Sequence, residues 1–195
     1  MFESIQNLYR ELMVATENHQ VISMQAIIAA MYVLAFAISL FRAIGNRELF
    51  SDFLSIATVV TKYALTSLLM EYVLIFIAEN QSIGNTQNIY LVACLINLVS
   101  IYILYLLHTK FSYKFGLLFF CVIKLTVVLS IAHFILWFKF VVLDIQTEHA
   151  YIHYMYSFIV LYISIVLAVV MLFPGLLKTK LKLLLSPSWP FGAKT

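Results

Sequence analysis

Residues 21–41 read VISMQAIIAAMYVLAFAISLF, and no formally charged side chain interrupts them. A helix rises about 1.5 Å per residue, so a run of this length covers the roughly 30 Å hydrocarbon core of a bilayer. Unpaired backbone groups are costly in hydrocarbon, so a crossing segment is either a helix or a strand of a closed barrel. A barrel strand needs only about ten residues. The stretch therefore predicts a transmembrane helix.

The rest of the chain continues this pattern. Hydrophobic residues make up 64% of the sequence and charged residues 11%, whereas about 25% of a typical soluble domain is charged. Four further apolar blocks cover residues 53–78, 89–108, 115–140 and 154–173. We therefore predict an all-α, polytopic transmembrane helical bundle with about five spanning helices. Cys94 and Cys121 both lie inside these blocks and are expected to be reduced packing residues.

The two ends of the chain differ from the apolar middle. Residues 1–20 place Phe2, Leu8 and Leu12 on one side of a helical period, which predicts an amphipathic helix lying on the membrane surface. Pro174-Gly175 is typical of a helix stop, and a lysine-bearing tail follows. The predicted organisation is an interfacial helix (1–20), a transmembrane bundle (21–174) and a basic cytoplasmic tail (175–195).

Lysine and arginine alternate between the connections, and this alternation predicts the orientation. The first and third connections and the tail carry them, whereas 79–88 and 141–153 carry none. Short loops rich in these residues tend to stay cytoplasmic. The C-terminus is therefore expected in the cytoplasm and the N-terminus outside, in a membrane such as the bacterial inner membrane. Five crossings fit this alternation and four would break it, unless block 53–78 were a re-entrant hairpin.

The inner basic residues are expected to contact anionic lipid headgroups or a cytosolic protein partner. They are Arg42, Arg47, Lys110, Lys114, Lys178, Lys180 and Lys182.

Five polar residues lie within the predicted spans: Lys62, Glu71, Asn97, Lys124 and His133. Such residues need a partner, a watery cavity or a route to the headgroups, so each is a functional candidate. Nine residues separate Lys62 from Glu71, and Lys124 from His133. Because that spacing amounts to a half-turn, the members of each pair point to opposite sides of their helix. One member could then face the bundle and the other a neighbouring subunit, which predicts a homo-oligomer.

Each of these residues also has a structural interpretation. Lys62 and Lys124 could snorkel to the inner headgroups. Glu71 could pair with His133 at a matching depth, and Asn97 could bind a neighbouring helix. Alternatively, Lys62 shares a helix side with Ser55, Thr58 and Thr66, a pattern that could line the vestibule of an ion-conducting oligomer.

Catalytic templates do not fit the sequence. It contains no G-x-S-x-G, H-E-x-x-H, phosphate-loop or glycine-rich dinucleotide pattern. His149 and His153 share a helical spacing, but beside Tyr151 and Tyr154 they favour an interfacial position over a metal site. We therefore predict no enzyme, no catalytic residue, no metal, no cofactor and no direct nucleic-acid binding. A membrane-embedded enzyme that uses Glu71 and His133 as an acid–base pair would need a substrate cavity.

In size, helix number and scarcity of catalytic groups, the chain resembles the small polytopic membrane subunits of bacterial anti-phage defence systems, including the Kiwa membrane subunit. The resemblance is one of layout, which colicin-immunity-like proteins share. It implies an oligomeric membrane sensor, anchor or scaffold that recruits a cytosolic partner through its loops and basic tail.

Overall fold

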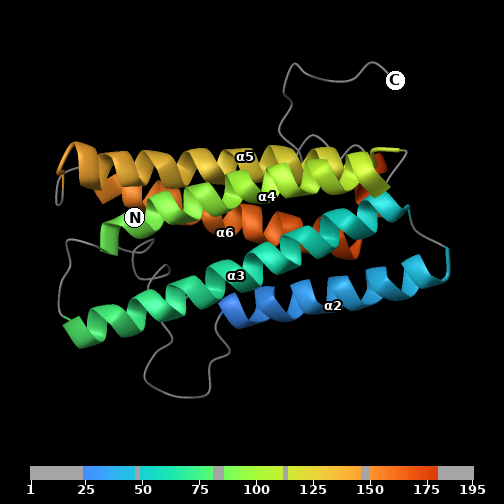
Figure 1. Ribbon diagram of the computed structural model, residues 1–195, viewed down its shortest axis with the longest axis horizontal. Helices are drawn as coiled ribbons and strands as arrows, with labels where there is room; N and C mark the ends of the chain where they lie inside the picture. The colour runs from blue at the N-terminus through green and yellow to red at the C-terminus, as the bar shows by residue number, and fades with distance from the viewer. Residues whose placement is uncertain (1–23, 47–48, 81–85, 112–113, 146–149, 180–195) are drawn as a thin grey trace.

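The computed structural model describes residues 24–46, 49–80, 86–111, 114–145 and 150–179, and these residues contain helices and no strand. The elements are α2 (Met24–Ile44), α3 (Phe50–Asn80), η1 (Thr86–Asn88), α4 (Ile89–Phe111), α5 (Leu117–Trp137), η2 (Phe138–Val142), α6 (Ala150–Leu172) and η3 (Pro174–Lys178). Five of these helices are long and apolar enough to cross a membrane. The predicted fold class is confirmed (Figure 1).

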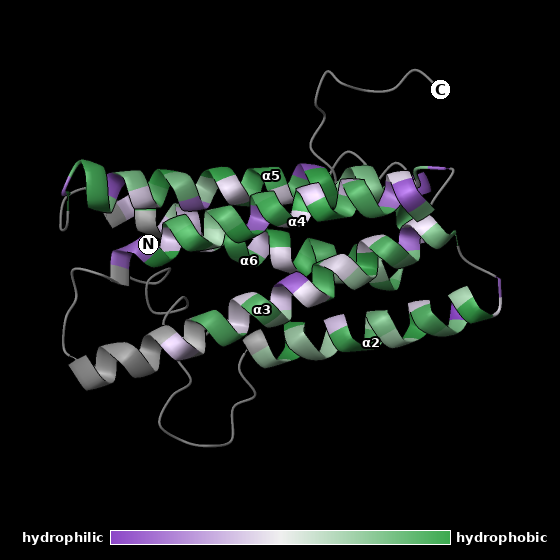
Figure 2. Cartoon of the chain, viewed as in Figure 1, coloured by the Kyte–Doolittle hydropathy of each residue, from purple (hydrophilic) through white to green (hydrophobic). Residues whose placement is uncertain are grey.

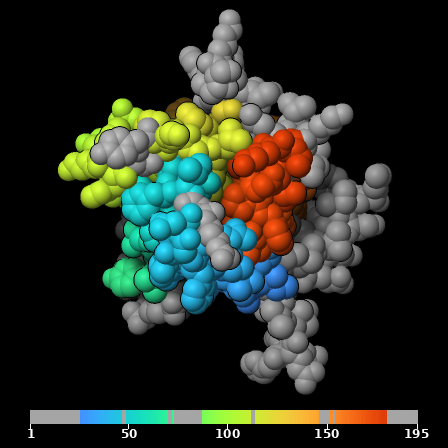
Figure 3. Space-filling model, turned by 90° about the vertical axis from the view of Figure 1, so that its right-hand side faces the viewer, coloured from blue at the N-terminus to red at the C-terminus, as the bar shows by residue number. Residues whose placement is uncertain are grey.

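The five long helices run alternately up and down, so that sequence neighbours pack antiparallel (Figure 1). The helices form a closed ring, because α2 packs against α6. Helix α3 also contacts α5. Consequently α5 contacts three other long helices. The ends of α2, α4 and α6 and the starts of α3 and α5 meet at one end of the bundle. This end is predicted to be cytoplasmic and is called the inner end below, and the opposite end is called the outer end. Figure 3 views the inner end directly.

The helix bounds refine the predicted spans. Helix α3 continues unbroken for 31 residues, about 46 Å at 1.5 Å per residue, so it must extend beyond the hydrocarbon or tilt. The re-entrant alternative for block 53–78 is therefore wrong. Block 115–140 divides instead: α5 ends at Trp137, and the π-helix η2 follows. Helix α6 ends at Leu172, two residues before Pro174, as the proline predicts.

Apolar side chains cover the outward faces as well as the core. Val33, Leu68 and Phe158 are each at least 64% exposed, and hydrophobic residues predominate along the coloured parts of the long helices (Figure 2). Lipid tails are as apolar as these side chains, so van der Waals packing and hydrogen bonds hold such helices together. One such bond joins α2 to α6, where the Tyr32 hydroxyl donates to the Ser164 carbonyl at 3.2 Å.

Several predictions concern parts of the chain that the structure does not describe. The amphipathic helix at 1–20 lies outside the described residues, as do Arg47, Lys180, Lys182 and His149. The side chains of Glu71 and His153 also lie outside them. These assignments stay predictions.

Candidate functional site

Two stripes of polar side chains meet in the middle of the bundle. On α3, Ser51, Ser55, Thr58 and Lys62 recur at intervals of four and three residues, which places them on one helix face. On α5, Thr126, Ser130 and His133 recur in the same way. The stripes join where the Lys62 ammonium donates to Thr126 Oγ1 at 3.4 Å. These seven residues are called the polar seam below.

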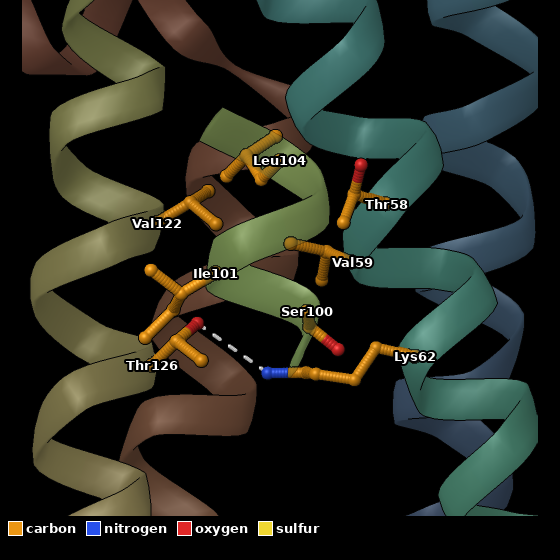
Figure 4. A pocket seen from close by; sticks show the side chains of 8 residues that line it. All are labelled: Thr58, Val59, Lys62, Ser100, Ile101, Leu104, Val122 and Thr126. Atoms are coloured by element: carbon orange, nitrogen blue, oxygen red, sulfur yellow. Dashed lines mark hydrogen bonds between the residues drawn. The ribbon is translucent and has the colours of Figure 1, made fainter. Parts of the chain in front are cut away.

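Lys62 is enclosed by three helices of one chain. Its side chain is 8% exposed and extends from α3 towards α5, with Ser100 of α4 beside it (Figure 4). The ammonium therefore ends inside the bundle at Thr126, and snorkelling to the headgroups does not describe it. A small cavity adjoins it, lined by Thr58, Val59, Lys62, Ser100, Ile101, Leu104, Val122 and Thr126.

The cavity offers water-sized space and oxygen acceptors. The centre of a water molecule has about 10 Å³ available to it, which is roughly what one buried water needs. Thr58 donates its hydroxyl hydrogen to the Leu54 carbonyl at 2.9 Å, and Ser100 donates its own to the Ile96 carbonyl at 2.7 Å. Both hydroxyl oxygens therefore keep only lone pairs for further contacts. They suit a hydrated ammonium better than an anion.

The outer half of the seam is joined to α4 and α6. Ser130 Oγ lies 3.2 Å from Cys94 Sγ of α4. His133 Nδ1 lies 3.0 Å from the Tyr156 hydroxyl of α6, with ring centroids 5.5 Å apart. The described partner of His133 is thus Tyr156, which no pattern in the sequence indicates. The predicted pairing with Glu71 stays a prediction, because the Glu71 side chain is not described.

The inner end of the seam holds a hydrogen-bonded cluster that the sequence analysis missed. Ser51 Oγ accepts from the Gly116 amide at 2.9 Å and lies 3.0 Å from His108 Nε2. The other ring nitrogen, Nδ1, lies 2.8 Å from the Leu104 carbonyl. Nδ1 donates to Leu104, because a carbonyl oxygen only accepts, and Nε2 also lies 3.1 Å from the Ser51 carbonyl. The Phe119 ring covers the imidazole at a centroid distance of 4.2 Å.

This cluster ties the inner ends of α3, α4 and α5 together. His108 is completely buried and Ser51 is 1% exposed, so neither side chain reaches the surface of the bundle. The available signal was the spacing of Asn97, Leu104 and His108, which share one face of α4. Lys110 follows closely, and a basic residue at that point is typical of a membrane edge, which draws attention away from His108.

Asn97 and Lys124 behave differently from the seam residues. Asn97 is buried, but its Nδ2 donates to the Ala93 carbonyl of its own helix at 2.8 Å. Its Oδ1 is also buried and has no hydrogen-bond partner within the described part of the chain. Within the described residues, the Asn97 side chain thus does not form the expected hydrogen bond to a neighbouring helix. Lys124 is half-buried and lies two residues before Thr126, away from the seam face.

Gly116 lies against the Asp52 carboxylate, which would have to move to make room for a side chain. A methyl group at residue 116 would overlap the Asp52 carboxylate, although the backbone there (φ −73°) suits any residue. We expect Gly116→Ala to destabilise the protein by about 1–2 kcal/mol through overpacking, measured by thermal unfolding in detergent. Gly175→Ala is the matched control, because its new methyl group meets nothing within 4 Å. Equal midpoints for the two variants would refute this packing argument.

Four of the described basic residues lie at the inner end of the bundle, the end that Figure 3 views. Arg42 lies half-buried in the last turn of α2, and Lys110 is exposed in the last turn of α4. Lys114 and Lys178 are exposed just before α5 and at the end of η3. At the opposite end, the described charged side chains include Lys139, which is buried, and Asp144, which is exposed.

Metal-binding chemistry finds no support in the described residues, which contain no group of three histidine, cysteine or acidic side chains that could hold an ion. Both cysteines are buried and form no disulfide, as expected. The features with chemical potential are therefore the polar seam and the basic inner end. Comparison of the chain with protein-family models, with curated proteins and with solved structures gives no match.

Proposed function

We propose that this integral membrane protein is a non-enzymatic sensor, anchor or scaffold that recruits a cytosolic partner through its basic inner end. One observation carries the proposal. Arg42, Lys110, Lys114 and Lys178 come from two connections and the start of the tail, far apart in sequence, yet all lie at one end of the bundle. Such a surface attracts an acidic partner or anionic headgroups.

Further features fit the same proposal. The inner end is braced by the Ser51–His108–Gly116 contacts, so it can present a fixed surface. The layout resemblance to membrane subunits of anti-phage systems adds a context, in which the partner is a soluble effector and the bound state responds to infection. Homo-oligomer formation belongs to this proposal as well. It no longer draws support from Lys62, which contacts Thr126 within its own chain.

A charge-reversal experiment tests the recruitment surface. In the double variant Lys110→Glu and Lys114→Glu, we expect co-purification of the cytosolic partner to fall by about tenfold, because opposed charges become like charges. The partner is captured from native membranes with the tagged full-length protein and identified by mass spectrometry. Deleting residues 178–195 should weaken the same capture.

The control substitution is Asp144→Asn at the opposite end. Asp144 has a backbone φ of 52°, which asparagine tolerates well, so this variant changes one charge while keeping the local fold. Unchanged capture by both the charge-reversed and the truncated protein would reject the basic end as the recruitment surface. Loss of capture by Asp144→Asn alone would place the surface at the other end.

The alternative function, an ion-conducting oligomer in which Lys62 lines a vestibule between subunits, has less support. A pore between subunits needs Lys62 on an outer face of the protomer, but the side chain is enclosed by α3, α4 and α5. Any conduction that uses Lys62 must therefore pass within one chain.

A further inference from the structure

The polar seam extends across most of the membrane within a single chain. From Ser51 to Lys62 is eleven residues of α3, about 16 Å, and from Thr126 to His133 is seven residues of α5, about 10 Å. The Lys62–Thr126 hydrogen bond joins these two runs. Their combined length of about 27 Å approaches the roughly 30 Å of bilayer hydrocarbon. Polar side chains thus recur along the bundle from the inner cluster at His108 to the outer pair His133 and Tyr156.

A buried lysine at position 62 is energetically unfavourable if its role is only to hold helices together. Within the described part of the chain, the hydrogen bond to Thr126 is the one polar contact of its ammonium group. Glu71 is on the same helix, about 13 Å further along and a half-turn round. A buried charge without a close counter-charge lowers stability and persists mainly where function needs it.

The size and chemistry of the cavity indicate which ion could use the seam. Space for about one water excludes hydrated sodium, potassium or chloride. A fixed ammonium repels metal cations, while Thr58 and Ser100 present lone pairs that do not suit an anion. The remaining candidate is a proton, because a proton can move between a lysine and a water without needing space for a further atom.

We propose that the polar seam is a proton path within one subunit, with Lys62 as its central proton-binding site. An N–H bond of the Lys62 ammonium breaks as a water molecule entering the cavity takes the proton towards one side of the membrane. The neutral amine then takes a proton from a hydronium arriving from the other side. One proton crosses per cycle, and no group is oxidised or reduced.

The inner cluster forms the closed end of this path. His108 and Ser51 are buried, and Phe119 packs on the imidazole. Leu104 and Leu118, each 1% exposed, add apolar bulk at this end. At the outer end, by contrast, Tyr156 is only half-buried beside His133. Protons thus reach the seam from outside, and opening of the Ser51–His108 contact controls exit to the cytoplasm.

Proton flux into proteoliposomes tests the proposal. Purified full-length protein is reconstituted into liposomes that enclose a pH-sensitive dye, and a potassium gradient with valinomycin drives protons inward. We expect flux above that of empty liposomes, and a reduction of at least about tenfold in Lys62→Met, because the central charged group is lost. Ser51→Ala should raise the flux by weakening the closed end.

Lys124→Met is the matched control, since it removes another intramembrane lysine that lies off the seam face. Its flux should stay within about twofold of the wild type, as expected for a side chain outside the path. Size-exclusion profiles of all variants verify that they are folded. The proposal is overturned if neither the wild type nor Ser51→Ala exceeds empty liposomes, if Lys62→Met conducts like the wild type, or if Lys124→Met loses flux equally.

Discussion

The variant His108→Ala should unfold far more easily than the wild type, with a loss of about 3 kcal/mol of stability. The substitution deletes a completely buried ring that contacts Ser51 and Leu104 and packs against Phe119. Truncating a large buried side chain typically costs about 2–5 kcal/mol through lost packing and an unfilled cavity. The loss of a hydrogen bond to Ser51 adds to it. Thermal unfolding in detergent, followed by circular dichroism, measures the effect.

Thr109→Ala provides the control for this prediction. Thr109 is the next residue on α4, but it is exposed, and its hydroxyl donates to the Leu106 carbonyl of its own helix. Its replacement should change stability by less than about 0.5 kcal/mol, as is usual for surface sites. A double-mutant cycle with Ser51→Ala isolates the contact between α3 and α4. Similar midpoints for His108→Ala and Thr109→Ala would contradict the role of His108 as a brace.

The sequence predicted the number and place of the long helices because hydrophobic run length reports directly on bilayer crossing. It predicted their ends less well. Block 53–78 stops where Asp52 and Glu79 begin the charged flanks, yet α3 runs from Phe50 to Asn80. A helix can continue into the headgroup region, where charged residues are solvated, so hydropathy marks the membrane and not the helix end.

The candidate site was only partly predictable, because its contacts depend on how the helices rotate against each other. Lys62 stood out from its sequence alone, and its shared face with Ser55 and Thr58 follows from helical spacing. Its partner Thr126 lies 64 residues away. The contact between Ser51 and His108 spans 57 residues. Periodicity within one helix contains no information about such pairs, so the seam emerged only from the packed bundle.

The second large effect concerns Lys62, whose buried ammonium group should lower the stability of the folded protein. Lys62→Met keeps nearly the same length and flexibility but removes the buried ammonium, and we expect it to stabilise the protein by about 1–3 kcal/mol. The methionine fits between Val59, Leu104 and Val122, which already line the cavity. Thermal unfolding in the same detergent measures the gain. Thr126 loses one weak contact of 3.4 Å, which offsets little of it.

Lys124→Met again serves as the comparison, because Lys124 is half-buried and gains less when its charge is removed. A lower midpoint for Lys62→Met than for the wild type would mean that the ammonium holds α3 to α5 and is structural. A higher midpoint together with lost proton flux would separate stability from function at one residue. Natural proteins tolerate a destabilising group where activity requires it. That combination would therefore explain why a lysine stands where an apolar side chain would pack better.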